Sequence, residues 1–418
     1  MSEVIAVNDE SLDALLATGD LVLLDLWAPW CQPCRTLAPL LETLARDGAP
    51  TLTVAKINVE KYPAAQQRFA VRGLPTLLLF RAGVEISRQL GVKTLPQLRT
   101  WLAAEGAVFS ESAIAPPAAQ APWPAFYHDP SLYQFLAQRL REHAEAAEIK
   151  VSFQPFWADG QGTTAAALAH HEHPAVFERI TGIPAALASM LDVLAFTTPQ
   201  QVEALLAVLV PGRDLGLVPL SWLHGLLSDA SLGWAAALEN VTLDDLRRLW
   251  LTLAEDELNG QPPQATAWQP LLNACSSLAI ALRREQQLES SLLELLGALS
   301  PPPAATEVAS WVGIGIQLRF VLGQFVQIQA GWSTEERETP ARREAWFREW
   351  QRQEPDGRFS EARLNALRAE WLRDNSAFSL KEEALYERYG ELMDDLTQPL
   401  RQALLSLLAA APEFVAQP

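Results

Sequence analysis

The feature that most constrains this chain is an apolar segment followed almost at once by two closely spaced cysteines. Residues 21–28 are rich in residues that favour buried strands, and Cys31-Gln32-Pro33-Cys34 comes three positions later. From there to about residue 45, apolar residues recur at helical spacing. The segment therefore predicts a buried strand that leads into a helix, with Cys31 at the start of the helix and Cys34 one turn further on.

Two thiols in this position are suited to thiol–disulfide exchange. That reaction requires a thiolate nucleophile and a second thiol close enough to resolve the mixed disulfide. Free amides and the dipole at a helix start lower the pKa of a thiol there, so we predict that Cys31 attacks and that Cys34 resolves. The alternatives are an inert dithiol or a metal site, although no second C-x-x-C or nearby His pair completes the four ligands that zinc prefers.

The cysteine count, the charge and the apolar segments limit the compartments and the partners that can be expected. Three cysteines in 418 residues indicate a reducing compartment, and the first ten residues do not resemble a signal peptide, so we expect a cytoplasmic protein. The net charge is −1 over residues 1–110 and −17 over residues 111–418, which argues against nucleic acid as a partner. Residues 311–332 are apolar but contain Arg319 and four glutamines, so we expect no membrane partner.

A stretch rich in proline and alanine divides the chain. Strand-like runs at 21–28, 52–59, 76–80 and 84–90 alternate with helical patterns before it, and helical patterns dominate after it. We predict an α/β domain at 1–106, a linker at 107–124 and a mainly α-helical acidic domain at 125–418. No fixed period is evident in the last part, so both a bundle and a helical-repeat-like array stay open.

The first part resembles the thioredoxin family. Its run Leu-Leu-Asp-Leu-Trp-Ala-Pro-Trp-Cys-Gln-Pro-Cys-Arg at 23–35 is similar to the active-site segment of that family almost position for position. The resemblance continues through Val-Arg-Gly-Leu-Pro-Thr at 71–76 to Gly91 and covers about residues 3–105. It implies the thioredoxin fold, a central mixed β-sheet flanked by helices. It also implies a protein-disulfide reductase with no metal and no cofactor other than its redox-active Cys31–Cys34 disulfide.

The same resemblance implies roles for residues near the dithiol. Asp25 lies inside an apolar strand and is expected to exchange a proton with Cys34, and Lys56 matches the family's partner to that acid. Gln32 stands where the family usually has Gly, and it is expected to affect docking or the redox potential. Substrate peptides are expected to bind near Pro75, in a cis-proline loop, and along Trp30, Gln32, Pro33, Leu74 and Gly91.

Two kinds of function follow for the whole chain. In the first, disulfide-containing proteins are the substrates, thioredoxin reductase or an equivalent reductant restores the dithiol, and the helical domain selects clients. In the second, the protein is a chaperone or adaptor similar to the chaperedoxins, with the thioredoxin domain chiefly a docking or redox-protective unit. Trp346 and Trp350, which lie one helical turn apart among charged residues, are candidates for a partner site.

Capping patterns predict several helix boundaries in the helical domain. Thr198 followed by Pro199 and Gln201 marks a start, and Thr242 and Ser379 open similar patterns. In the last segment, apolar residues from Leu385 to Leu407 recur at three- and four-residue steps. Pro399 interrupts that pattern and predicts either a kink or a second helix capped by Thr397.

Overall fold

The N-terminal α/β part is built on a mixed five-stranded sheet with the strand order β1-β3-β2-β4-β5. The computed structural model describes residues 4–17, 21–29, 31–69, 71, 74–90, 95–109, 123–282, 286–354 and 359–415. β1, β3 and β2 run parallel, β4 is antiparallel to β2, and β5 is antiparallel to β4. The expected sheet is thereby confirmed, with the strands β1 (Ile5–Val7), β2 (Leu21–Trp27), β3 (Leu52–Asn58), β4 (Thr76–Arg81) and β5 (Val84–Leu90).

Helices cover both faces of this sheet. On one face, Val22, Leu24 and Leu26 of β2 pack with α1 (Asp9–Leu16) and α3 (Pro63–Arg68). On the other, Leu21 and Leu23 pack with α2 (Gln32–Asp47) and α4 (Leu95–Ala104). Because β2 is buried on both faces, its sequence is an uninterrupted apolar run rather than an alternation.

The first strand, β1, is absent from the sequence prediction. It has three residues, and only Val7 among them is buried, so neither an apolar run nor a clear alternation marks it. It forms through its pairing with β3, in which Ile5 lies opposite Ala55 and Val7 opposite Ile57. Its stability therefore comes from a partner 50 residues away in the sequence.

The helical part, residues 123–415, is organised around a large hydrophobic core that includes residues from Ala125 to Ala411, with a smaller cluster around Trp332 and Leu385. All ten residues of α8 are buried, and α16 packs against α8, α15 and α19. In a solenoid each repeat would contact only its neighbours, whereas here helices far apart in the sequence share the core. The elements before α13 are η2 (Ala125–His128), α5 (Pro130–Glu145), β6 (Trp157–Ala158), β7 (Gln161–Gly162), α6 (Thr164–Ala169), α7 (Pro174–Thr181), α8 (Ala185–Leu194), α9 (Pro199–Val208), α10 (Val218–Leu227), α11 (Asp229–Leu232) and α12 (Trp234–Ala237).

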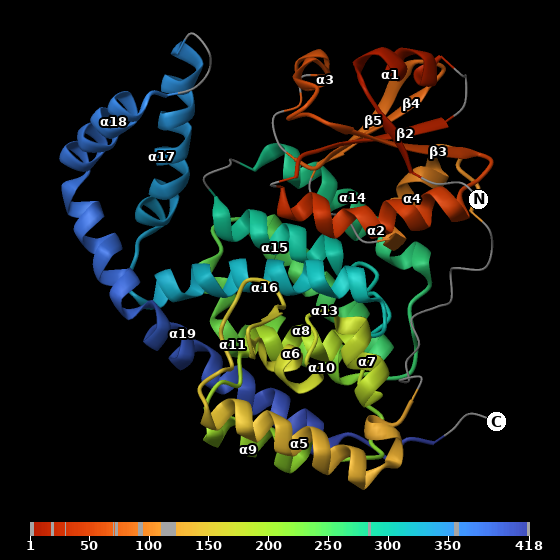
Figure 1. Ribbon diagram of the computed structural model, residues 1–418, viewed down its shortest axis with the longest axis vertical. Helices are drawn as coiled ribbons and strands as arrows, with labels where there is room; N and C mark the ends of the chain where they lie inside the picture. Colours follow the sequence, from red (N-terminus) through yellow and green to blue (C-terminus); the bar gives the residue numbers. More distant parts are fainter. Residues whose placement is uncertain are drawn as a thin grey trace.

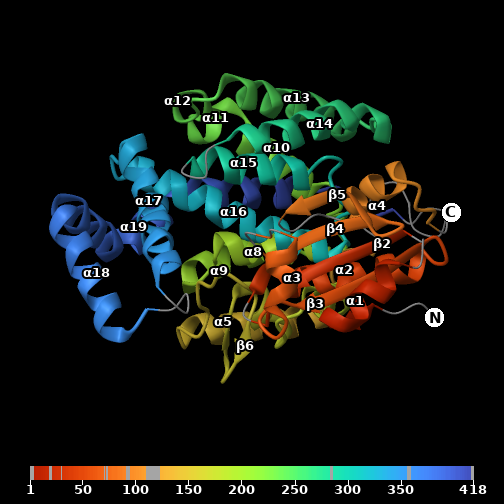
Figure 2. The same cartoon turned by 90° about the horizontal axis from the view of Figure 1, so that it is seen from above.

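The remaining helices complete this core and then extend beyond it. They are α13 (Val241–Leu258), α14 (Ala265–Ala281), α15 (Gln287–Ala298), α16 (Val308–Gln329), α17 (Thr334–Gln353), α18 (Glu361–Asp374) and α19 (Ser376–Ala410). Figures 1 and 2 show α17, α18 and the first half of α19 projecting from the body as an arm. Trp346 lies inside this arm. The centroid of its ring is 6.1 Å from that of Trp350 and 5.6 Å from that of Trp371. Trp346 and Trp350, the two tryptophans noted in the sequence, are therefore half-buried against each other and their neighbours.

Several predicted helix boundaries are corrected by the structure. Thr198 caps α9 as expected, but Asn240 caps α13 in place of Thr242, by accepting a hydrogen bond from the Leu243 amide. α19 runs without a break past Ser379 and Pro399. Thr397 does not cap a second helix, because its hydroxyl donates to the Met393 carbonyl within α19.

Helix α16 is apolar enough to be compared with a membrane span. Within the described part of the chain it alone combines the necessary length with a mean hydropathy of 1.2, and half of that window is buried inside the protein. Its Arg319 donates to the backbone carbonyl of Asp192, and Gln317 donates to Glu294 at 2.7 Å. These contacts are typical of a core helix.

The α/β part and the helical part meet at α2, α4 and α16. Helix α2 contacts α16, and Ala309 of α16 packs against the core beneath α2 and α4 (Figure 1). Arg99 of α4 forms an ion pair with Asp47 of α2. Burial raises the pKa of Glu307 beside α16, while the hydroxyl of Ser310 and the charge of Arg99 act in the opposite direction. The helix that begins next to Cys31 is therefore also a contact helix for the helical part.

The shared core predicts a strong difference between two leucines of α19. Leu404 is fully buried, whereas Leu380 is 68% exposed. Leu404→Ala should lower the free energy of unfolding by about 3 kcal/mol because it leaves a cavity in the core. Leu380→Ala, the same change in the same helix, should lower it by less than about 0.5 kcal/mol. Chemical denaturation of both variants measures this, and equal losses would contradict the packing described here.

Candidate active site

The two cysteines lie where β2 gives way to α2. Cys31 is the N-cap residue of α2, and its backbone amide donates to the carbonyl of Ala28 at 3.0 Å. Its sulfur accepts a hydrogen bond from the amide of Cys34 at 3.2 Å. A sulfur in this position interacts with an orphan amide of the helix start and with the positive end of the helix dipole, and both stabilise a thiolate.

Cys31 and Cys34 are joined by a disulfide bond, so the structure represents the oxidised form. Both residues are buried and belong to the same core cluster as Leu24 and Leu26 of β2. The sequence predicts that the two cysteines lie one helical turn apart, and the 5.3 Å between their Cα atoms agrees with this spacing. The pair can therefore pass between a dithiol and a disulfide within one helix start.

Asp25 is a buried acid in the middle of β2. The residue is 3% exposed, and its Oδ1 atom has no hydrogen-bond partner among the described residues. Burial raises the pKa of Asp25 to about 7, and the positive charge of Lys56 acts in the opposite direction. Lys56 lies directly opposite Asp25 in the register of β2 and β3, and its ammonium is 5.8 Å from the ring centroid of Trp27.

A small pocket brings this acid and the second cysteine together. Asp25, Cys34 and Lys56 all line it, as does Trp27. Its other walls are Val4 and three residues of α2 that the sequence interpretation did not single out, namely Ala38, Leu41 and Glu42. The spacing of these three from Cys34, at four, seven and eight residues, is the signal in the sequence that places them on the same face of the helix.

The peptide bond between Leu74 and Pro75 is cis, as the resemblance implied. Pro75 is buried and directly precedes β4, in which Thr76 lies opposite Leu26 of β2. Pro75 therefore lies at the same edge of the sheet at which β2 ends and α2 begins. Trp30 and Gly91 lie outside the described residues, as do the side chains of Gln32 and Pro33, whose backbones open α2.

Metal chemistry finds no support in the described ranges. They contain no group of three or more His, Cys, Asp or Glu side chains that could hold a metal ion. Cys275, the third cysteine, is buried in the core of the helical part as a residue of α14. The described candidate residues for redox chemistry are thus gathered around Cys31 and Cys34.

Comparisons with known proteins agree with this geometry. The family model described as thioredoxin matches residues 3–104. A thioredoxin from Haemophilus influenzae is 39% identical over 103 residues, which are 24% of this chain and 96% of the relative. A thioredoxin from Acidithiobacillus ferridurans is 40% identical over 100 residues, 24% of this chain and 93% of the relative.

A solved structure of a mutant thioredoxin from Halobacterium salinarum is 33% identical, covers 26% of this chain and 95% of its own, and has a TM-score of 0.24. The two bacterial relatives are matched over nearly their whole length and well above 30% identity. Through its N-terminal quarter, this chain belongs to the thioredoxin family.

Proposed function

We propose that this protein is a thiol–disulfide oxidoreductase that reduces disulfides in other proteins. The observation that carries the proposal is the placement of Cys31 at the N-cap of α2, with its sulfur accepting the Cys34 amide, beside a buried acid that shares a pocket with Cys34. The N-cap position favours Cys31 as the nucleophile. Cys34 is the resolving thiol, and Asp25 and Lys56 control its protonation.

The reaction proceeds in two exchanges. The Cys31 thiolate attacks one sulfur of the substrate disulfide, that bond breaks, and one substrate thiolate leaves while the other sulfur stays bonded to Cys31. The Asp25 carboxylate then accepts the proton of Cys34. The Cys34 thiolate attacks the Cys31 sulfur, forms the Cys31–Cys34 disulfide and releases the second substrate thiolate. Two electrons pass from the dithiol to the substrate.

The shape of the site supports a peptide-like substrate. Pro75 directly precedes β4, and its neighbour Thr76 lies opposite Leu26, so Pro75 is at the edge of the sheet where β2 ends and the segment toward the dithiol begins. We propose that Leu74 and Pro75, together with Trp30, Gln32, Pro33 and Gly91, contact the substrate backbone. Thioredoxin reductase or an equivalent reductant restores the dithiol, and a reducing compartment such as the cytoplasm suits this cycle.

Substitution of single cysteines tests the assignment of their roles. Cys31→Ser should abolish the reduction of insulin disulfides, because no nucleophile remains. Cys34→Ser should instead accumulate a mixed disulfide between Cys31 and the substrate, visible by mass spectrometry. Cys275→Ser, a change outside the site, is the control and should keep full activity. Continued insulin reduction by Cys31→Ser would contradict the mechanism.

The raised pKa of Asp25 predicts an unusual dependence of stability on pH. In the folded protein its pKa is about 7, above the ordinary value of 3.8, so the folded state binds the proton more tightly than the unfolded state. The free energy of unfolding should therefore fall as pH rises from 4 to 8, by up to roughly 4 kcal/mol from this group. Asp25→Asn should remove this loss, whereas Glu60→Gln, an exposed acid of the same part, should retain it.

Denaturation of the oxidised protein at pH 4, 6 and 8 measures the effect on stability. The resolving step supplies a second readout, because the rate at which the mixed disulfide collapses should rise with pH around 7 in the unaltered protein. In Asp25→Asn the step should be slower at pH 7 and should lose this inflection. An unchanged pH profile would remove Asp25 from the mechanism.

A second candidate function, the holding of unfolded proteins, is favoured by apolar side chains on the arm. Leu372, Leu380 and Tyr386 are 53%, 68% and 68% exposed, on two adjacent helices. Large exposed apolar groups of this kind are suited to contact with other proteins. In this alternative the helical part retains clients, and the dithiol keeps their cysteines reduced.

The aggregation of heat-denatured citrate synthase distinguishes the two functions. If the arm holds clients, the full chain carrying Cys31→Ser and Cys34→Ser should still suppress aggregation. Adding Leu380→Glu and Tyr386→Glu should abolish that suppression. Val241→Glu, at an equally exposed position on the body of the helical part, should not. Unhindered aggregation in the presence of the double cysteine variant would eliminate the holding function.

A further inference from the structure

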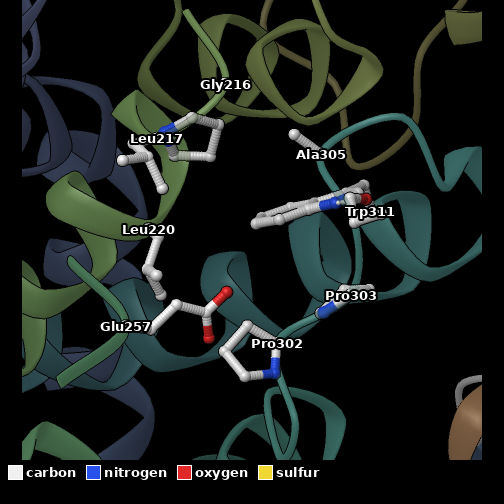
Figure 3. Close-up of a pocket in the computed structure, with 10 residues that line it drawn as sticks. Gly216, Leu217, Leu220, Glu257, Pro302, Pro303, Ala305 and Trp311 are labelled. Atoms are coloured by element: carbon white, nitrogen blue, oxygen red, sulfur yellow. Dashed lines mark hydrogen bonds between the residues drawn. The ribbon is translucent and has the colours of Figure 1, made fainter. Parts of the chain in front are cut away.

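A second pocket lies in the helical part, outside the redox site. It is formed by the segment that leads into α10, the end of α13, and the loop and first turns that connect α15 to α16. Its walls are almost entirely apolar and include Leu217, Leu220, Pro302, Pro303 and Trp311. Figure 3 shows the carboxylate of Glu257 directed into the space between Pro302 and the indole of Trp311.

The carboxylate of Glu257 has no partner among the described residues. The residue is 6% exposed. Burial raises the pKa of Glu257, and no hydrogen-bond donor or cation of the described residues acts to lower it. A buried carboxylate in a folded protein is normally paired, because an unpaired one is costly. An unpaired carboxylate that lines an open pocket is therefore a candidate ligand-binding group.

The position of Glu257 adds to this cost. It is the second-last residue of α13, at the helix end where the carbonyl groups point outward and the dipole is negative. A negative side chain is disfavoured there even on the surface. The negative charge of Glu257 and the negative end of the helix dipole together favour a positive charge at this site. None of the pocket-lining residues supplies one.

The hydrogen-bonding groups around the carboxylate also favour a ligand that is positively charged. Pro302 and Pro303 have no backbone N–H to donate. The indole N–H of Trp311 is occupied, since it donates to the carbonyl of Ala304 at 2.9 Å. The pocket therefore combines a hydrogen-bond acceptor with an aromatic ring and apolar walls, which suits a group that carries hydrogen-bond donors and a positive charge on an alkyl chain.

We propose that this pocket binds the ammonium group of a primary alkylamine, with Glu257 as its counter-ion and Trp311 as its aromatic wall. The pocket encloses about 20 Å³, which is room for the ammonium group and little more, so the alkyl chain extends along Leu217, Leu220 and the two prolines toward the open mouth. A free amine and the side chain of a lysine on another protein share this chemistry. The site is independent of the dithiol, so its occupation does not depend on the proposed redox function.

Titration of the full-length protein with n-butylamine tests the proposal. Calorimetry at pH 8 should show saturable binding, and the melting temperature should rise relative to sodium chloride at the same concentration. n-Butanol has a similar chain but no charge, and it should do neither. This comparison uses the unaltered protein, so it does not depend on whether a variant folds. Equal effects of the alcohol and the amine would overturn the proposal.

Matched variants then locate the site. Glu257→Gln should weaken n-butylamine binding roughly tenfold or more, since it keeps the shape and removes the charge. Glu255→Gln, an exposed acid of the same helix turn, should leave binding unchanged, and so should the Cys31→Ser, Cys34→Ser double variant. Unchanged binding in Glu257→Gln would overturn the assignment. Parallel titration with Nα-acetyl-lysine methylamide identifies the source: binding indicates a protein lysine, and binding of n-butylamine alone indicates a free amine.

Discussion

The burial of β2 on both faces is the constraint on which the redox site depends. Five-stranded pairing puts β2 in the centre of the sheet, with helices over each face, so residues 21–26 of this strand are buried. Asp25 lies in this environment, and burial raises its pKa to about 7. The same strand ends one short turn before Cys31, so the strand that buries the acid also positions the N-cap sulfur.

The α/β part could be predicted well from the sequence because its signals are local. The apolar run of β2, the cysteines at the helix start and each single strand or helix pattern occupy fewer than 20 residues. β1 was not predicted, because a three-residue strand forms only through its pairing with β3. Asp25, Cys34 and Lys56 were named from the sequence, whereas the shared pocket that also includes Glu42 depends on how α2 lies over the sheet.

The helical part could be predicted only in outline. Helical periodicity identified its fold class as mainly α-helical. Several helices, however, contact partners more than 100 residues away in the sequence, and no local sequence pattern indicates which helices pair. Pro399 illustrates the limit: it predicted either a kink or a second helix capped by Thr397, and the second helix does not form, because α19 packs through Leu400 and Leu404 into the core and stays continuous. Glu257 had no distinguishing signal either, because a glutamate near a helix end is ordinarily solvated. Its isolation results from the loop that precedes α16.

The contact between α2 and α16 has a consequence for how substrates are reached. A thioredoxin unit on a loose tether would sample many orientations, and each encounter with a client would have to be found by diffusion. Here the helix that begins at the dithiol rests against a core helix of the helical part, so the sulfur atoms keep a defined direction relative to the arm. Under the proposed function, the choice of substrate would then depend on docking geometry more than on intrinsic reactivity, because a disulfide would be reduced only where its docking brings it to that one location.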